Sequence, residues 1–214
     1  MAKVHSFTFS PFYENMYIVY DETKECIIFD PGCSNDNERS RLKKWLAAEG
    51  LKPMRLINTH CHLDHVFGNA FIAREYNLGL EIHEGELPIL ANFKSSLQRF
   101  GLPDMEASPA PDRFIKEGEL IKFGNTTLKT LLVPGHSPAS LCFYDEASQF
   151  VIAGDTLFEG SIGRTDLPGG NHNLLLKSIK EQLFTLPDDV VVYPGHGGST
   201  TIGREKATNP FLKD

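Results

Sequence analysis

The chain has 214 residues, of which 41% are apolar and 23% are charged, and its formal net charge at pH 7 is −7. This length and composition predict a soluble protein with a single domain, residues 1–214. The acidic balance argues against nucleic acid or an anionic membrane as a partner, and no apolar run approaches the roughly 20 residues of a membrane span.

The N-terminal segment has no apolar stretch followed by a cleavage site of small residues, so we expect no signal peptide. The four cysteines have no CxxC spacing, which favours reduced thiols and a cytoplasmic protein. A disulfide between Cys26 and Cys33 is the alternative that the sequence leaves open.

The first half of the chain alternates predicted strands and helices. Segments rich in β-branched and aromatic residues indicate strands at residues 4–9, 16–19, 26–29, 55–58 and 80–82. Apolar residues at helical spacing predict helices at residues 37–48, with Gly50 suited to the helix end, and at residues 66–76.

Residues 92–113 differ from their surroundings, because aromatic and apolar residues alternate with prolines without a sustained period. We predict a long connection here rather than a core element. Such connections are often lids or binding loops, and a surface crossover without a functional role is the alternative.

The second half repeats the pattern of the first. Strands are predicted at residues 120–123, 126–133, 141–144, 150–153 and 190–193, and helices at residues 173–183 and 203–207. Two successive sets of strands, helix and strand predict an α/β (α+β) fold in which two sheets pack face to face with helices outside. This arrangement is a four-layer αββα sandwich.

Histidines and aspartates are concentrated in four short motifs, each after an apolar run that is predicted to be a strand. The motifs are HCHLDH at residues 60–65, PGH at 134–136, GD at 154–155 and PGH at 194–196. Their candidate metal ligands are His60, His62, Asp64, His65, His136, Asp155 and His196. Imidazole and carboxylate groups suit zinc, manganese and iron, and the lack of a thiolate cluster argues against a closed structural site.

The spacing of the first motif predicts ligands for two ions. In an extended segment residues i and i+2 point the same way, so His60 and His62 can converge on one ion. Asp64 and His65 lie on the following turn, which can direct them toward a second ion.

The remaining candidate ligands complete the two sets. His136 would join the first set and His196 the second, and Asp155 could bridge both ions with its two oxygens. An open site with neutral ligands lowers the pKa of bound water to about 7, and two ions roughly 3.5–4 Å apart can clamp attacking and leaving atoms. The pattern therefore predicts a hydrolase.

Five longer stretches make the chain resemble the metallo-β-lactamase superfamily, and within it a short form of the glyoxalase II (hydroxyacylglutathione hydrolase) branch. They are IIFDPG at residues 27–32, INTHCHLDHVFGN at 57–69, LLVPGHSPASLCFY at 131–144, IAGDTLFEGSIGR at 152–164 and VVYPGHGGSTTIGREKATNPFL at 191–212. The resemblance implies the sandwich fold, and the family's ligand pattern is filled at all of the candidate positions.

The resemblance also implies hydrolysis of a small acyl thioester, such as an S-acylglutathione, with two zinc ions, or else iron or manganese. A hydroxide that bridges the ions would attack the thioester carbonyl, with Asp64 and Asp155 as the catalytic carboxylates. Asp64 would orient the hydroxide and Asp155 would hold both ions. Asp30 matches the family's aspartate that supports a ligand from behind, and a helix or turn cap is its alternative role.

Two departures from the family bear on the substrate. Full-length enzymes of the branch carry a C-terminal helical domain with basic residues for glutathione, and only residues 197–214 follow His196 here. Arg164 matches a basic residue that contacts glutathione in the family, so it is the predicted substrate-binding residue. The tyrosine expected two residues later is Asp166, which makes an Arg164–Asp166 ion pair the alternative.

Four other residues with metal-binding side chains are not assigned to the site. We expect His5, His83 and His172 to be surface or structural histidines. Cys61 lies between two candidate ligands and points away from them by strand alternation, which favours core packing over redox sensing.

A function from another reaction class is the main alternative. Persulfide dioxygenases share this fold and the GRTD stretch at residues 163–166, and they hold one iron with two histidines and an aspartate, here His60, His136 and Asp155. Thr156 in GDTLF favours the hydrolase. Other ester or lactone hydrolases of the fold are weaker alternatives, and the sequence does not indicate an oligomeric state.

Overall fold

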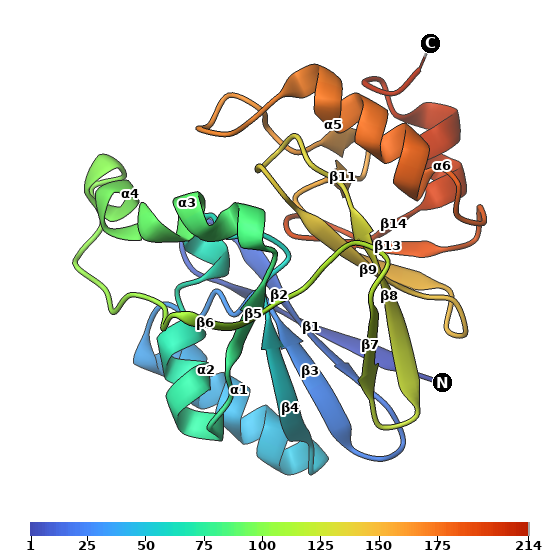
Figure 1. Ribbon diagram of the computed structural model, residues 1–214. Coiled ribbons are helices and arrows are strands. Elements are labelled where there is room, and N and C mark those ends of the chain that lie inside the picture. The colour runs from blue at the N-terminus through green and yellow to red at the C-terminus, as the bar shows by residue number, and fades with distance from the viewer. Residues whose placement is uncertain (214) are drawn as a thin grey trace.

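Two six-stranded sheets form the centre of the structure, a computed structural model that describes residues 1–213 (Figure 1). The first sheet has its strands in chain order, antiparallel from β1 to β3 and parallel from β3 to β6. Its strands are β1 (Lys3–Phe9), β2 (Glu14–Tyr20), β3 (Glu25–Phe29), β4 (Lys52–Ile57), β5 (Leu80–Ile82) and β6 (Pro111–Phe114).

The second sheet has the order β14-β13-β10-β9-β8-β7. Its strands are β7 (Leu120–Phe123), β8 (Thr126–Leu132), β9 (Leu141–Asp145), β10 (Phe150–Gly154), β13 (Val191–Pro194) and β14 (Thr200–Thr201). A short hairpin of β11 (Leu157–Phe158) and β12 (Ser161–Ile162) leaves the end of β10 and forms a separate two-stranded sheet. Sequence patterns did not predict this hairpin, because each of its strands contains only two residues.

The two sheets pack face to face through apolar side chains that alternate along the strands. Ile27 and Phe29 of β3 belong to the same buried cluster as Phe143 of β9 and Ile152 of β10. The rings of Phe29 and Phe143 are fully buried, with centroids 4.8 Å apart. Because side chains alternate between the two faces of a strand, the intervening residues Cys26 and Ile28 face the helices instead.

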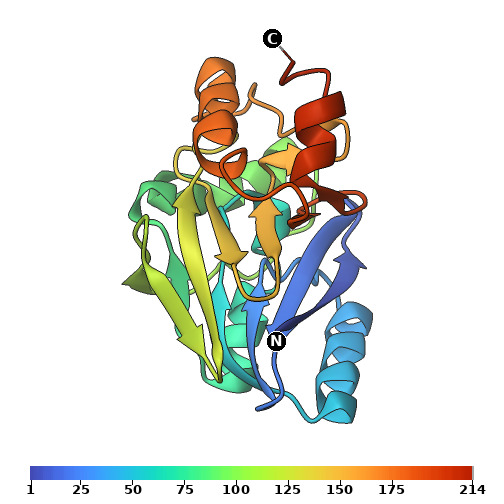
Figure 2. The same cartoon turned by 90° about the vertical axis from the view of Figure 1, so that its right-hand side faces the viewer.

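Helices cover the outer face of each sheet, and the predicted αββα sandwich is confirmed. The first sheet is covered by α1 (Asp36–Glu49) and α2 (Asn69–Tyr76), and the second by α5 (His172–Ser178) and α6 (Ile202–Thr208). Figure 2 shows α5 and α6 beside each other near the C-terminus, and α1 at the other end of the molecule. No helix within residues 1–213 is long and apolar enough to cross a membrane.

Helix boundaries differ from the predicted ones where the chain turns tightly. The helix predicted at residues 66–76 begins at Asn69, because the ligand motif forms a 3-10 turn, η1 (Leu63–His65), just before it. The helix predicted at residues 173–183 is α-helical only to Ser178 and continues as a π-helical turn, η3 (Ile179–Leu183).

The long connection predicted at residues 92–113 is present only in part, because residues 100–110 form no helix or strand but the residues on either side do. A turn, η2 (Glu84–Glu86), leads into α3 (Leu87–Ala91) and α4 (Phe93–Arg99), and residues 111–114 form the edge strand β6. Phe93 and Leu97 lie one helical turn apart and are buried against the core of the first sheet. A single apolar pair over two turns of helix is too short a repeat to stand out in the sequence.

Candidate metal centre

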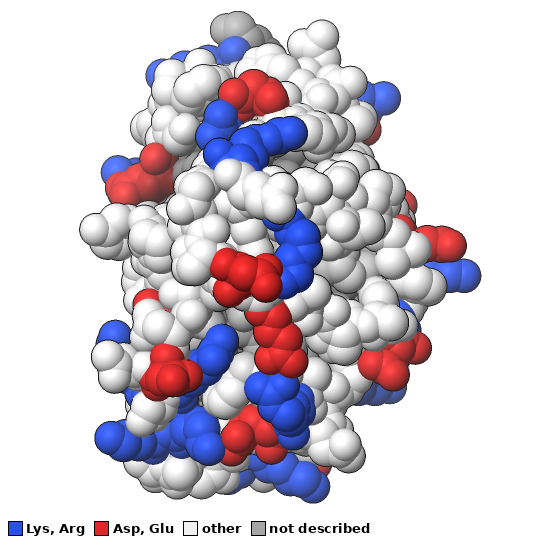
Figure 3. Space-filling model, turned by 90° about the vertical axis from the view of Figure 1, so that its left-hand side faces the viewer, with Lys and Arg blue, Asp and Glu red and all other residues white. Residues whose placement is uncertain are grey.

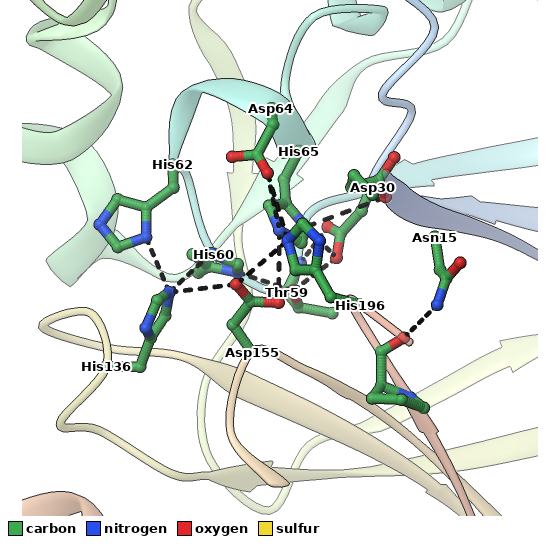
Figure 4. A network of polar contacts seen from close by, with 12 residues as sticks. Asn15, Asp30, Thr59, His60, His62, Asp64, His65, His136, Asp155 and His196 are labelled. Carbon is green, nitrogen blue, oxygen red and sulfur yellow. Dashed lines mark hydrogen bonds and ion pairs between the residues drawn. The ribbon is translucent and has the colours of Figure 1, made fainter. Parts of the chain in front are cut away.

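The candidate ligands lie where strands of both sheets end at one edge of the sandwich. β4 of the first sheet leads into residues 60–65, while β8, β10 and β13 of the second sheet lead into His136, Asp155 and His196. Figure 4 shows these side chains directed toward one another. The structure therefore brings together all seven residues that the sequence motifs singled out.

Three imidazole rings form one half of the centre, called here the three-histidine group. His136 Nε2 lies 2.8 Å from His62 Nδ1 and 3.2 Å from His60 Nε2. Each residue offers one ring nitrogen, and these atoms all lie within 4.8 Å of one another. A single ion can accept donor atoms at this spacing.

Asp64, His65 and His196 form the other half, called here the Asp64 group. Asp64 Oδ2 lies 3.2 Å from His196 Nε2 and 3.9 Å from His65 Nε2. Their donor atoms also lie within 4.8 Å of one another. Since Asp64 contributes a carboxylate, this half differs from the first in the charge of its donors.

Asp155 lies between the two groups (Figure 4). Its Oδ2 atom is 3.5 Å from both His136 Nε2 and His196 Nε2, and its Oδ1 atom is 3.4 Å from His65 Nε2. A side chain at Gly195 would collide with Asp155 Oδ1 and with His65, so the second PGH motif requires its glycine. The geometry suits a carboxylate that bridges two ions.

Asp30, at the end of β3, supports the Asp64 group from behind. Its Oδ1 atom accepts a hydrogen bond from the Thr59 backbone N–H at 2.7 Å. Its Oδ2 atom accepts one from the Thr59 hydroxyl at 2.6 Å and lies 3.1 Å from His65 Nδ1. The cap of the following helix is Asn35, so Asp30 supports a ligand rather than capping a helix.

Neighbouring acceptors assign the ring proton of His60 and of His136. His136 Nδ1 lies 2.7 Å from the Arg164 carbonyl, and His60 Nδ1 lies 3.1 Å from the Thr59 hydroxyl, which already donates to Asp30. Both rings therefore carry their proton on Nδ1 when neutral, and their Nε2 lone pairs face the centre.

Burial keeps the three-histidine group neutral. Burial, with the charge of His136 adding to it, lowers the pKa of His62 to about 3. Burial also lowers the pKa of His60 and that of His136. Neutral imidazole is the form that coordinates metal.

Carboxylates reverse this effect in the Asp64 group. Burial would lower the pKa of His196, but hydrogen bonds to Asp155 and Asp64 raise it to about 9. Burial is likewise outweighed at His65, where the charges of Asp155 and Asp64 hold the pKa well above its usual value. Burial would raise the pKa of Asp155, but the charge of His65 and hydrogen bonds from His196 and His65 hold it well below its usual value.

The donor atoms fit metal ions. The Nε2 lone pairs of His60 and His136 face each other at 3.2 Å, an arrangement that is repulsive without a cation between them. His65 Nε2 and Asp155 Oδ1 are buried and, apart from their contact with each other at 3.4 Å, lack a hydrogen-bond partner among the described residues. Buried polar atoms without partners are rare, and metal coordination would satisfy these.

A cavity of about 470 Å³ lies over the centre, within the size range of small-molecule sites. One wall comes from α3 and α4 with Phe93, Arg99 and Phe100, and another from residues 158–168, including Arg164. The floor contains His62, Asp64, His136, Asp155 and His196. The cavity therefore offers apolar walls, two arginines and direct access to the candidate ligands.

Arg164 pairs with Asp166, as the alternative interpretation of the sequence expected. Its Nε and Nη2 atoms donate to the two carboxylate oxygens, both at 2.7 Å. Both side chains are more than half exposed, at 58% and 68%. Arg99, on the opposite wall, has no ion-pair partner within residues 1–213.

The residues that the sequence left outside the centre have other contacts. His5 stacks on Trp45 with ring centroids 3.9 Å apart, and His83 accepts a hydrogen bond from the Gly85 N–H. His172 begins α5. Cys61 is buried in the core of the first sheet, and all four cysteines are free thiols.

Sequence motifs missed two buried carboxyl groups near the centre. Glu14 begins β2, is fully buried and lies 3.9 Å from His65 Nδ1. Burial, opposed by the charge of His65, raises the pKa of Glu14 well above its usual value. Glu86 ends η2 and is also fully buried. A charged residue at the start of an apolar strand, as in ENMYIVY, was the one signal for Glu14, and no signal marked Glu86.

The fold and the centre together define a metal-dependent hydrolase of the αββα type. The protein-family model of the metallo-β-lactamase superfamily matches residues 10–196 of the chain. The chain is 38% identical to a hydroxyacylglutathione hydrolase, GloC, of Haemophilus influenzae, over 94% of this chain and 93% of that protein. It is also 38% identical to a probable metallo-hydrolase, YqgX, of Bacillus subtilis, with the same coverage.

Solved structures agree with these sequence matches. A B3 metallo-β-lactamase, BLEG-1, superposes with a TM-score of 0.90 at 34% identity, over 99% of this chain and 100% of that one. TTHA1623, crystallised in a di-iron-bound form, superposes with a TM-score of 0.87 at 36% identity, over 97% of this chain and 100% of that one. The chain belongs to the metallo-β-lactamase superfamily.

Proposed function

We propose that this metallo-hydrolase is a thioester hydrolase of the glyoxalase II type, which holds two zinc ions and acts on S-acylglutathione or a similar small acyl thioester. The observation that carries the proposal is the pair of three-donor groups with Asp155 between them, at the floor of an open cavity. A di-iron relative and a relative named hydroxyacylglutathione hydrolase support the two-ion centre and the substrate class.

The ions would be held by the three-histidine group and the Asp64 group, with Asp155 shared. When bound, such ions lower the pKa of water to about 7 and polarise a carbonyl oxygen. Asp64 Oδ2 lies at the cavity floor, 3.2 Å from His196 Nε2, where it can orient the attacking water and accept its proton. The imidazoles of His60 and His136 hold their proton on the far side, at Nδ1, and so direct Nε2 lone pairs toward the centre.

The cavity suits a small molecule with an apolar part and an anionic part. Phe93, Phe100 and Phe158 contribute aromatic rings to its walls, and Arg99 and Arg164 contribute guanidinium groups. The carboxylates of a glutathione moiety are suitable partners for these groups. The side of the molecule that carries α3 and α4 mixes positive and negative side chains without one large basic patch (Figure 3), which supports a small-molecule substrate rather than nucleic acid.

The test is an assay of purified, zinc-loaded protein with S-D-lactoylglutathione, with and without a strong chelator. We expect hydrolysis that the chelator abolishes and added zinc restores. The exposed His172→Ala is the matched control for His62→Ala, since only His62 faces the centre. Hydrolysis that persists in metal-free protein would contradict the proposal.

The same preparation separates the hydrolase from the persulfide dioxygenase. A dioxygenase would consume oxygen with glutathione persulfide and would need iron at His60, His136 and Asp155 alone. The structure offers three further donors, Asp64, His65 and His196, on the other side of Asp155, which favours a two-ion hydrolase. Oxygen consumption by the iron-loaded protein, without thioester hydrolysis by the zinc-loaded protein, would move the assignment to the dioxygenase.

A further inference from the structure

Glu86 is a fully buried carboxylate that receives three hydrogen bonds. Its Oε2 atom accepts from the Cys61 backbone N–H at 2.9 Å. Its Oε1 atom accepts from the Ser137 hydroxyl at 2.7 Å and from the Ala139 backbone N–H at 2.8 Å. A buried carboxylate is stable only when its charge is compensated by donors of this kind.

These donors belong to the two loops that supply the three-histidine group. Cys61 lies between His60 and His62, and Ser137 directly follows His136. The first loop continues β4 of the first sheet, and the second continues β8 of the second sheet. The Glu86 carboxylate therefore connects the two sheets at the point where their ligands meet, 25 residues after Cys61 and 51 before Ser137.

Glu86 occupies a position that corresponds to that of Asp30 on the other half of the centre. Asp30 contacts a ligand ring directly, at His65 Nδ1. Glu86 contacts two backbone N–H groups and the Ser137 hydroxyl beside the ligands, and no ligand ring. Each half of the centre thus has its own buried carboxylate behind it.

We propose that Glu86 is a positioning residue that sets the spacing of His60, His62 and His136 and so the affinity for the ion they hold. The inference rests on the proposed metal centre but not on the thioester substrate. With Glu86 removed, the two loops lose three hydrogen bonds near the centre and keep the one from the Leu141 N–H to the Thr59 carbonyl. Part of the free energy of metal binding is then spent on ordering the loops. Loss of such a supporting contact typically weakens metal binding by about 10- to 100-fold.

Glu205 provides a matched control. It is also fully buried, and its carboxylate accepts from the Gly160 N–H at 2.9 Å, the Thr200 hydroxyl at 2.6 Å and the Asn209 side-chain amide at 2.8 Å. It therefore has the same kind of network as Glu86, but on α6, and none of its donors is next to a candidate ligand in the sequence, as Cys61 and Ser137 are. Glu86→Gln and Glu205→Gln each replace one carboxylate oxygen by an amide that faces donors, so both should lower the melting temperature.

The experiment measures zinc affinity by competition with a chromophoric chelator, together with the absorption spectrum of the cobalt-substituted protein. We expect Glu86→Gln to bind one of the two ions about 10- to 100-fold more weakly and to alter the cobalt spectrum. Glu205→Gln should retain both zinc affinities and the wild-type spectrum. Ser137→Ala removes only one of the three donors, so this variant should fold. It should weaken the binding of the same ion to a smaller extent than Glu86→Gln does.

Wild-type zinc affinities in both Glu86→Gln and Ser137→Ala would overturn the proposal, as would an equal loss in Glu205→Gln. A wild-type chain that bound no divalent ion would overturn the metal centre and this proposal together. A chain that bound two ions, lost one in Glu86→Gln and hydrolysed no thioester would support the role of Glu86 while contradicting the proposed substrate.

Discussion

The two halves of the candidate centre lie on either side of Asp155 but differ in charge. The three-histidine group consists of rings that burial keeps neutral, with a pKa of about 3 at His62. The Asp64 group surrounds its rings with carboxylates, which raise the pKa of His196 to about 9. A cation entering the first half meets lone pairs, and one entering the second must displace protons. The same fold edge therefore provides two sites that should fill with different pH dependence.

The largest effect is expected at the residue that the two halves share. Asp155→Asn should lower kcat/KM for a thioester by more than about 100-fold. It should also weaken the binding of both ions, because Asp155 faces both groups. His62→Ala should weaken the binding of only the ion that the three-histidine group holds. Metal analysis after dialysis, together with steady-state kinetics, checks both variants, and unchanged turnover in His62→Ala would contradict the site assignment.

The pH dependence of metal binding tests the charge difference between the halves. Because the pKa of His196 is about 9, binding at the Asp64 group should release protons at pH 7, and its affinity should rise as pH approaches 9. Binding at the three-histidine group should release none at pH 7, since His62 is already neutral. Calorimetry in two buffers of different ionisation enthalpy counts the protons, and equal release for both ions would contradict the comparison.

The same pKa shifts predict the stability of the metal-free protein. The raised pKa of His196 contributes stability that is fully present below about pH 6.5 and is lost as pH rises through about 9. The lowered pKa of His62 contributes stability that is present above about pH 6.5 and is lost as pH falls toward 3. The melting temperature of chelator-treated protein should therefore be highest near neutral pH. Thermal denaturation across pH 4–10 measures this, and a maximum far from neutral pH would contradict the prediction.

The two cavity walls should contribute unequally to substrate binding. Arg164 is already paired with Asp166, whereas Arg99 has no ion-pair partner within residues 1–213. Arg99→Ala should raise KM for S-D-lactoylglutathione about fivefold, as expected for an exposed ion pair of about 1 kcal/mol, and Arg164→Ala somewhat less. Both should leave kcat nearly unchanged. A neutral thioester serves as the control substrate, and an equal KM increase for it would argue against an ionic contact.

The smallest effect on the centre is expected from a change in the scaffold. Asn35 caps α1 by accepting a hydrogen bond from the Glu38 N–H at 3.1 Å. Asn35→Ala should cost about 1 kcal/mol of unfolding free energy. Its zinc affinities and kcat should equal those of the wild type, because α1 contributes no ligand. Denaturant titration measures the first quantity, and a changed zinc affinity would show that the scaffold and the centre are coupled.

The sequence predicted the sheets and the clustering of ligands for a common reason. Apolar strands such as residues 150–153 have a strong pattern, and His136, Asp155 and His196 directly follow such strands. Once the strands form two stacked sheets, their ends meet at one edge, and the ligands meet with them. The apolar pattern of each strand and the ligand that follows it therefore predicted the meeting of ligands that are far apart in the sequence.

Features that depend on backbone hydrogen bonds or on short repeats could not be predicted in this way. The partners of Glu86 are two backbone N–H groups and one hydroxyl, and the segment HEGEL contains no spacing that identifies them. The helix α4 was missed because Phe93 and Leu97 alone define its apolar side. Arg99 could be recognised as a wall residue only after α4 was seen above the centre.

Titration of the metal-free protein with zinc, while hydrolysis of S-D-lactoylglutathione is followed, tests the two-ion hydrolase most directly. We expect no hydrolysis without zinc. The full rate should be reached only at two equivalents, when both the three-histidine group and the Asp64 group hold an ion. Hydrolysis by the metal-free protein, or a rate that does not change with added zinc, would contradict this expectation.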